Sequence, residues 1–208
     1  MEKLRELVRT GKAKDTEARV KELLKAGKTP EAIMKEAMIP AMDDAGDLFQ
    51  KGEYFLPEIM VAARAMQQGM NVLKPHLLKA NVKPVGKVVV GTVEGDFHDI
   101  GKNLVAITLE GAGFEVIDLG TDVAPAKFVE AIKQHKPQVV GLSALLTATM
   151  VAMKDTIEAI EAAGLRDQVK IMIGGAPVRQ EFCREIGADF CGPDSTSGRD
   201  YARDVVSG

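Results

Sequence analysis

The spacing of the apolar residues changes near residue 83, and this change divides the chain into two parts. Before it, apolar residues recur every three or four positions, which is the period of an amphipathic helix. After it, short runs rich in valine and isoleucine alternate with helical segments. The sequence therefore predicts a helical domain at residues 1–82 and an α/β domain at residues 83–208.

The first part contains four predicted helices. Two short amphipathic segments come first, and Thr29 followed by Pro30 begins a third helix, because threonine caps a helix and proline suits its first turn. Pro40 interrupts the apolar stripe of that helix and is expected to bend it. A fourth helix is expected to open at Pro57. Its apolar seam, with alternating spacings of four and three, consists of Ile59, Ala63, Met66, Met70, Leu73 and Leu77. These features predict a four-helix bundle.

The second part contains four predicted strands, at residues 87–93, 114–119, 138–143 and 169–173. Because helical segments separate them, they are expected to form a parallel sheet with helices on both faces, the doubly wound arrangement. In such a sheet, ligands bind at the carboxyl ends of the strands.

Polar and small residues gather at those strand ends. They are Asp96, His98 and Gly101 after the first strand, Ser143, Thr147 and Thr149 after the third, and Gly174 and Gly175 after the fourth. Glycines at a strand end leave room for another group. One histidine is too little for a metal site made by protein alone, but it suits one axial bond to a metal that arrives inside a macrocycle. Ordinary alternatives remain, since loop histidines are often solvated and hydroxyls often cap helices.

Phosphate-binding motifs do not account for the same segments. Gly95 and Gly101 are separated by five residues where a P-loop has four, and Asn103 replaces the magnesium-binding serine or threonine. The Gly111–Gly113 segment lies where a helix leads into a strand, which is the wrong end for a dinucleotide motif.

Composition excludes several classes of protein. The formal net charge of −3 gives no general attraction to nucleic acid or to an anionic membrane, and no apolar run approaches about 18 residues. The charged N-terminus is unlike an export signal. Cys183 and Cys191 fit neither a disulfide scaffold nor paired zinc ligands. A cytoplasmic protein that binds neither nucleic acid nor membrane is expected.

Three motifs together resemble a known signature. Asp96-x-His98-x-x-Gly101, Ser143-x-Leu145 and Gly174-Gly175 are similar to the signature of cobalamin-binding domains such as that of methionine synthase. The segments 46–49 and 54–57 resemble the methylcobalamin cap of the same family. The whole chain resembles the stand-alone corrinoid proteins of anaerobic methyltransferase systems. The resemblance implies a four-helix cap followed by a flavodoxin-like, Rossmann-like, doubly wound parallel sheet of five strands.

The resemblance also implies roles for individual residues. His98 would replace the cofactor's benzimidazole as the axial ligand of the corrin cobalt, Asp96 would accept a hydrogen bond from the other ring nitrogen, and Thr149 would stand in for the serine that extends this relay. The tail of the cofactor would pass glycines and hydroxyls, and an aromatic and an aliphatic residue of the cap would shield the methyl group. These further contacts are Gly101, Ser143, Leu145, Thr147, Gly174, Gly175, Phe49 and Leu56. For Phe49 and Leu56, simple burial in the bundle core is the alternative.

The implied function is that of a methyl carrier, which is not a complete enzyme alone. A cobalamin or related corrinoid, passing through methylcobalamin, cob(II)alamin and cob(I)alamin, would take a methyl group from a substrate-specific methyltransferase. A second methyltransferase would load it onto tetrahydrofolate or a thiol, and a corrinoid-reducing activator would be a third partner. The donor remains open among methoxyaromatics, methylamines, betaine and methanol. Residues 81–84 would be the hinge of the cap. The alternative is a cobalamin-dependent sensor that acts by protein contact.

Overall fold

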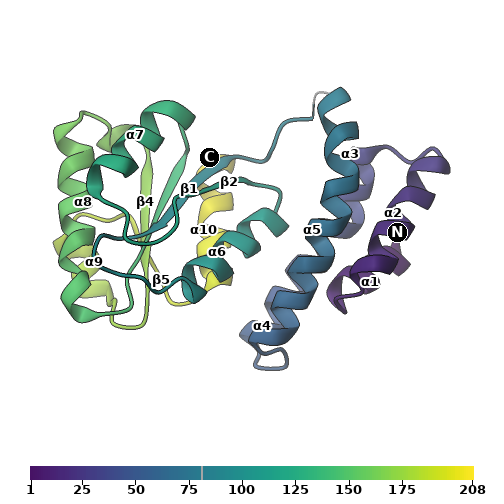
Figure 1. Ribbon diagram of the computed structural model, residues 1–208, viewed down its shortest axis with the longest axis horizontal. Coiled ribbons are helices and arrows are strands. Elements are labelled where there is room, and N and C mark those ends of the chain that lie inside the picture. Colours follow the sequence, from purple (N-terminus) through teal and green to yellow (C-terminus); the bar gives the residue numbers. More distant parts are fainter. Residues whose placement is uncertain (81) are drawn as a thin grey trace. The chain divides into compact units, whose positions relative to one another are not determined.

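Helices alone build the N-terminal part of this computed structural model, which describes residues 1–80 and 82–208 (Figure 1). They are α1 (Glu2–Arg9), α2 (Ala13–Lys25), the continuous run α3 (Pro30–Ile33), η1 (Met34–Met38) and α4 (Ile39–Gln50), and α5 (Leu56–Lys79). The four predicted helices are therefore confirmed. Thr29 caps α3 as expected, accepting a hydrogen bond from the Ala32 N–H at 3.2 Å.

The interruption predicted at Pro40 takes the form of a wider helical turn. The π-helix η1 immediately precedes α4, in which Pro40 is the second residue. Proline has no N–H to continue the regular helical ladder, and a π-helical turn accommodates such a break. Within the apolar seam of α5, all the residues named above are buried except Met70, which is half-buried.

The C-terminal part contains a parallel sheet of five strands in the order β2-β1-β3-β4-β5. The strands are β1 (Lys87–Thr92), β2 (Glu115–Asp118), β3 (Val139–Ser143), β4 (Lys170–Gly174) and β5 (Phe190–Gly192). The first four confirm the strands predicted from the sequence, and the sheet has the expected flavodoxin-like order. The three residues of β5 are too few to show an alternating pattern.

Helices cover both faces of the sheet. They are α6 (Ile100–Gly111), α7 (Pro125–His135), α8 (Val151–Ala162), α9 (Gln180–Glu185) and α10 (Ser195–Ser207), with the short turns η2 (Thr147–Thr149) and η3 (Arg166–Gln168). Figure 1 shows α7 and α8 on one side of the strands and α6 and α10 on the other. None of the helices in the described ranges is long and apolar enough to cross a membrane.

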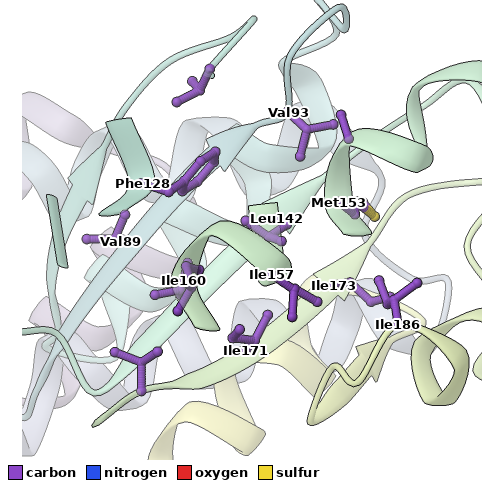
Figure 2. Close-up of a cluster of buried hydrophobic side chains, with 14 of the residues drawn as sticks. Val89, Val93, Phe128, Leu142, Met153, Ile157, Ile160, Ile171, Ile173 and Ile186 are labelled. Carbon is purple, nitrogen blue, oxygen red and sulfur yellow. The ribbon is translucent and has the colours of Figure 1, made fainter. Parts of the chain in front are cut away.

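The main hydrophobic core lies between the sheet and α7, α8 and α9. Figure 2 shows alternate strand residues, among them Val89, Leu142 and Ile171, beside Phe128 of α7 and Ile157 of α8. Because strand side chains alternate between faces, the residues between them point toward α6 and α10. Burial of the apolar side chains on both faces accounts for the valine and isoleucine runs that identified the strands.

The order of the strands reverses between β1 and β3. β1 leads into α6 on one face, whereas β3 leads into α8 on the other. At the carboxyl edge of the sheet, the chain therefore leaves these two neighbouring strands toward opposite faces, and the two paths diverge. This divergence is where open α/β sheets bind ligands. The chain divides into two compact units, Met1–Pro84 with Gly111–Gly113, and Val85–Glu110 with Phe114–Gly208. Asn81, the first residue of the predicted hinge, lies outside the described residues.

Candidate functional site

Asp96 forms several hydrogen bonds at the carboxyl edge of the sheet. It lies in the loop after β1, is fully buried, and accepts hydrogen bonds on both carboxylate oxygens. Oδ1 accepts from the backbone N–H of His98 at 3.1 Å and lies 2.7 Å from His98 Nδ1. Oδ2 accepts from the N–H of Leu145 at 2.8 Å, the N–H of Leu146 at 3.3 Å and the Thr149 hydroxyl at 2.6 Å. The loops after β1 and β3 therefore meet at one carboxylate.

These donors decide the charge of Asp96. Burial by itself would raise the pKa of this carboxyl, but the Thr149 hydroxyl, the Leu145 N–H and His98 outweigh burial and hold the pKa well below its usual range. An ionised carboxylate only accepts hydrogen bonds, so Nδ1 of His98 carries the proton in the bond that joins them.

His98 is oriented by its neighbours and leaves one ring nitrogen available. Its side chain is half exposed, and its backbone carbonyl accepts a hydrogen bond from the buried Thr92 hydroxyl at 2.9 Å. Within residues 1–80 and 82–208, no group hydrogen-bonds to Nε2. With Nδ1 protonated and bound to Asp96, Nε2 carries a lone pair that suits a metal. This donor set fits one axial bond to a metal held in a macrocycle.

A metal site made by protein alone finds no support in the part of the chain that the structure describes. No group of three or more histidine, cysteine, aspartate or glutamate side chains lies together there in a way that suits a metal ion. A metal bound at His98 must therefore bring most of its ligands with it.

Thr149 occupies the place predicted for the third member of the relay. It is the last residue of η2, nearly buried, and its hydroxyl lies 2.9 Å from the Leu146 carbonyl as well as 2.6 Å from Asp96 Oδ2. Its methyl group, which serine lacks, lies beside Gly95, where an added Cβ would be 3.7 Å from Thr149 Cγ2. The structure thus brings together His98, Asp96 and Thr149, and the threonine methyl finds space within the site.

A row of polar and small residues crosses the ends of the strands. The parallel register places Thr92 beside Ser143, Ser143 beside Gly174, and Gly174 beside Gly192. All four face the same side of the sheet, toward α6 and α10. A Cβ added at Gly174 would meet only the Gly192 carbonyl oxygen, at 3.6 Å, so there is room above the row. This room suits the cofactor tail that the family resemblance implies here.

The other predicted contacts after β3 and β4 divide into two kinds. In the described part of the chain, the hydroxyls of Ser143 and Thr147 have no hydrogen-bond partner, so both can bind a ligand. Gly175 has a structural requirement of its own. Its φ is +134°, and an added Cβ would lie 1.8 Å from the Ala144 carbonyl oxygen. The close approach of these two loops explains Gly175 without a ligand.

Apolar side chains are exposed on the two loops that meet at Asp96. Large hydrophobic residues of the two loops and of the helix starts that follow them are exposed: Phe97, Ile100, Leu145, Leu146 and Val151. Only Leu145 was among the residues predicted from the sequence. Such a cluster is unusual on a protein surface and indicates a binding site. The sequence did contain a signal for this cluster. These apolar residues stand in loops and in the first turns of helices, where neither the helical period nor the strand period requires an apolar side chain.

The remaining predicted contacts lie in helices. Gly101 is the second residue of α6, is exposed, and has nothing within 4 Å of an added Cβ. Phe49 belongs to α4 and Leu56 begins α5, and both are half-buried. Neither is fully enclosed in the bundle core, so each retains surface for a further contact.

Comparisons with known proteins identify the family to which the chain belongs. The family described as B12 binding domain matches residues 86–198, and a second family with the same description matches residues 1–74. Trimethylamine corrinoid protein 1 of Methanosarcina acetivorans is 46% identical over 188 residues, 89% of this chain and 84% of that protein. The dimethylamine corrinoid protein of Methanosarcina barkeri is 40% identical over 195 residues, 93% and 92% of the two chains.

A solved structure extends the likeness to the fold. A chain of the methanol:cobalamin methyltransferase complex MtaBC from Methanosarcina barkeri superimposes with a TM-score of 0.89 and is 29% identical, covering 99% of this chain and 78% of that one.

Proposed function

The chain belongs to the family of B12-binding proteins, and we propose that it carries methyl groups for a methyltransferase system that consumes methylated amines. Its cofactor is cobalamin or a related corrinoid. The amine is inferred from the relatives, which are named for trimethylamine and dimethylamine. Of the four classes of methyl donor that the sequence left open, the proposal therefore retains the methylated amines.

The observation that carries the proposal is the free Nε2 of His98 beside a buried, ionised Asp96. When bound, the corrinoid supplies a cobalt ion that accepts and releases methyl groups. His98 would hold that ion from below through Nε2, in the base-off, His-on form. Asp96 would keep the proton on Nδ1, and the Thr149 hydroxyl would keep Asp96 in place. The chain's own part is thus to orient one lone pair.

Other residues would hold the cofactor without touching the metal. Ser143 and Thr147 would hydrogen-bond to the nucleotide tail, and the open space at Gly174 would admit it. The exposed apolar residues of the two loops would cover the corrin, since burying them stabilises the complex by about 25 cal/mol per Å². Phe49 and Leu56 of the helical part would shield the methyl group.

Three partners complete the proposed cycle. A methyltransferase specific for a methylated amine would load the carrier, a second methyltransferase would pass the group to tetrahydrofolate or a thiol, and an activator would restore the reduced cofactor. We further propose that residues 1–82 form the cap and residues 83–208 bind the cofactor. Residues 81–84 would then act as the hinge that gives each partner access.

Reconstitution with a corrinoid tests the coordination. The full chain loaded with cobalamin and reduced to the cob(II) state should show a nitrogen ligand in its electron paramagnetic resonance spectrum. In His98→Ala the protein ligand should be absent, whereas the control His76→Ala, an exposed histidine of α5, should match wild type. An unchanged spectrum in His98→Ala would reject the His-on form.

Transfer assays test the carrier function. Protein loaded with cob(I)alamin should be methylated by trimethylamine or dimethylamine in the presence of the corresponding methyltransferase, and more slowly with methanol and a methanol-specific enzyme. Efficient loading from methanol alone would contradict the assignment of an amine donor.

A further inference from the structure

The connection between β2 and α7, residues 119–124, extends the sheet past the end of β2. The Leu119 N–H donates to the Val90 carbonyl at 2.9 Å, and the Thr92 N–H donates to the Gly120 carbonyl at 2.9 Å. Val93 and Val123 then form an isolated parallel bridge. This connection therefore runs alongside the start of the loop that carries Asp96 and His98.

Asp122 makes two attachments to that loop. Its carboxylate Oδ1 accepts a hydrogen bond from the Gly95 N–H at 2.7 Å. Its own backbone N–H donates to the Asp96 carbonyl oxygen at 2.9 Å. Asp122 thus holds the backbone at two successive residues, the second of which carries the carboxylate that orients His98.

The backbone at Asp122 adopts a conformation that side chains rarely take. Its φ is +54°, and in the described part of the chain Lys136 is the one other non-glycine residue with a positive φ. Aspartate tolerates this region better than most residues do. The conformation nevertheless costs free energy, and it persists only where the surrounding structure imposes it. The two hydrogen bonds to Gly95 and Asp96 are contacts that this conformation makes available.

We propose that Asp122 is a positioning residue for the axial ligand His98. It acts through the backbone of Gly95 and Asp96, and then through the Asp96 carboxylate to Nδ1 of His98. The inference rests on the proposed function, because it assigns His98 to the metal. It adds a second acidic residue to the site, beside Asp96, and no motif in the sequence marks it.

Three substitutions at Asp122 separate its contributions. Asp122→Asn keeps an acceptor oxygen and suits a positive φ, Asp122→Gly relaxes the backbone and removes the acceptor, and Asp122→Ala removes the acceptor without relaxing the backbone. In the full chain loaded with cob(II)alamin, the ratio of His-on to His-off spectra should fall about three- to tenfold in the Gly and Ala variants. Asp122→Asn should stay close to wild type.

Nuclear magnetic resonance of the chain without cofactor gives a readout that does not depend on the metal. In Asp122→Gly, the Gly95 amide should lose the downfield shift of an N–H bound to a carboxylate, and the ring nitrogens of His98 should shift. The core variant Ile160→Val, from α8, should leave both signals and the His-on ratio unchanged.

Several results would overturn the inference. They are a wild-type ratio in Asp122→Gly, a loss in Asp122→Asn as large as in Asp122→Gly, or an equal loss in Ile160→Val. Should Asp122→Ala fail to fold, the Gly and Asn variants still decide the matter. If His98→Ala itself keeps the wild-type nitrogen ligand, the proposed coordination is wrong, whereas the cofactor-free spectra still test whether Asp122 orients His98.

Discussion

The Thr149 hydroxyl donates a 2.6 Å hydrogen bond to the buried carboxylate of Asp96, although the two residues lie 53 positions apart. The bond joins the loop after β1 to the turn that precedes α8. Since Asp96 also binds Nδ1 of His98, this contact connects the orientation of the predicted metal ligand to the pairing of two strands.

Replacing Asp96 by asparagine should destabilise the chain without cofactor by about 2–4 kcal/mol, because an amide N–H₂ would face donors that now bind a carboxylate oxygen. Denaturant unfolding measures the loss. The exposed Asp167→Asn serves as control and should change stability by less than about 0.5 kcal/mol. Equal effects of the two variants would refute the importance of the Asp96 contacts.

The difference in stability between wild type and Asp96→Asn should depend on pH. The pKa of Asp96 is lowered in the folded chain, so its carboxylate contributes stability that is fully present above its ordinary pKa of 3.8. That contribution is lost progressively as the pH falls below this value. Unfolding free energies measured across the acid range should therefore converge for the two proteins. A constant gap would show that the charge of Asp96 is not involved.

Two substitutions at Thr149 distinguish its hydroxyl from its methyl group. Thr149→Val keeps the shape but removes the donor to Asp96, and should cost about 1–3 kcal/mol in unfolding free energy. Thr149→Ser keeps the donor and loses the methyl group beside Gly95, and should cost about 1 kcal/mol or less. Thermal or chemical unfolding of both variants provides the comparison, and the reverse order of stability would contradict the relay.

Two glycines of the signature should respond differently to alanine. Gly175→Ala should lower stability by more than about 3 kcal/mol, because its Cβ would overlap the Ala144 carbonyl at a φ of +134°. Gly101→Ala has open space in the first turn of α6 and should leave stability unchanged or raise it by up to about 1 kcal/mol. Gly101→Ala should therefore bind the corrinoid more weakly while it remains fully stable, which is not expected of Gly175→Ala. Titration of the folded variants with cobalamin measures it.

Phe97→Ser should weaken corrinoid binding about tenfold without lowering stability, because the phenyl ring is exposed in the free chain and would be covered in the complex. The control is Val85→Ser, an exposed apolar residue outside the two loops. Binding titrations of the two variants test the apolar surface, and equal affinities would remove Phe97 from the site.

Short-range patterns in the sequence were sufficient for the four helices of the N-terminal part, for four strands and for the motif that contains His98. Each depends on side-chain period or on residues a few positions apart, which the chain displays before it folds. The strand β5 and the turn η1 escaped such patterns, because one is only three residues long and the other depends on how the helix accommodates Pro40.

The backbone groups that donate to Asp96 from the loop after β3 were decided by tertiary structure alone. Backbone N–H groups of Leu145 and Leu146 reach it because β1 and β3 pair in a particular register, and a backbone group has no signature in a sequence. The same holds for Asp122, whose place beside Gly95 follows from the pairing beyond β2. The sequence determined which side chains stand in the loops at the carboxyl edge, whereas the sheet decided their geometry, since hydrogen bonds between distant loops exist only after the strands align.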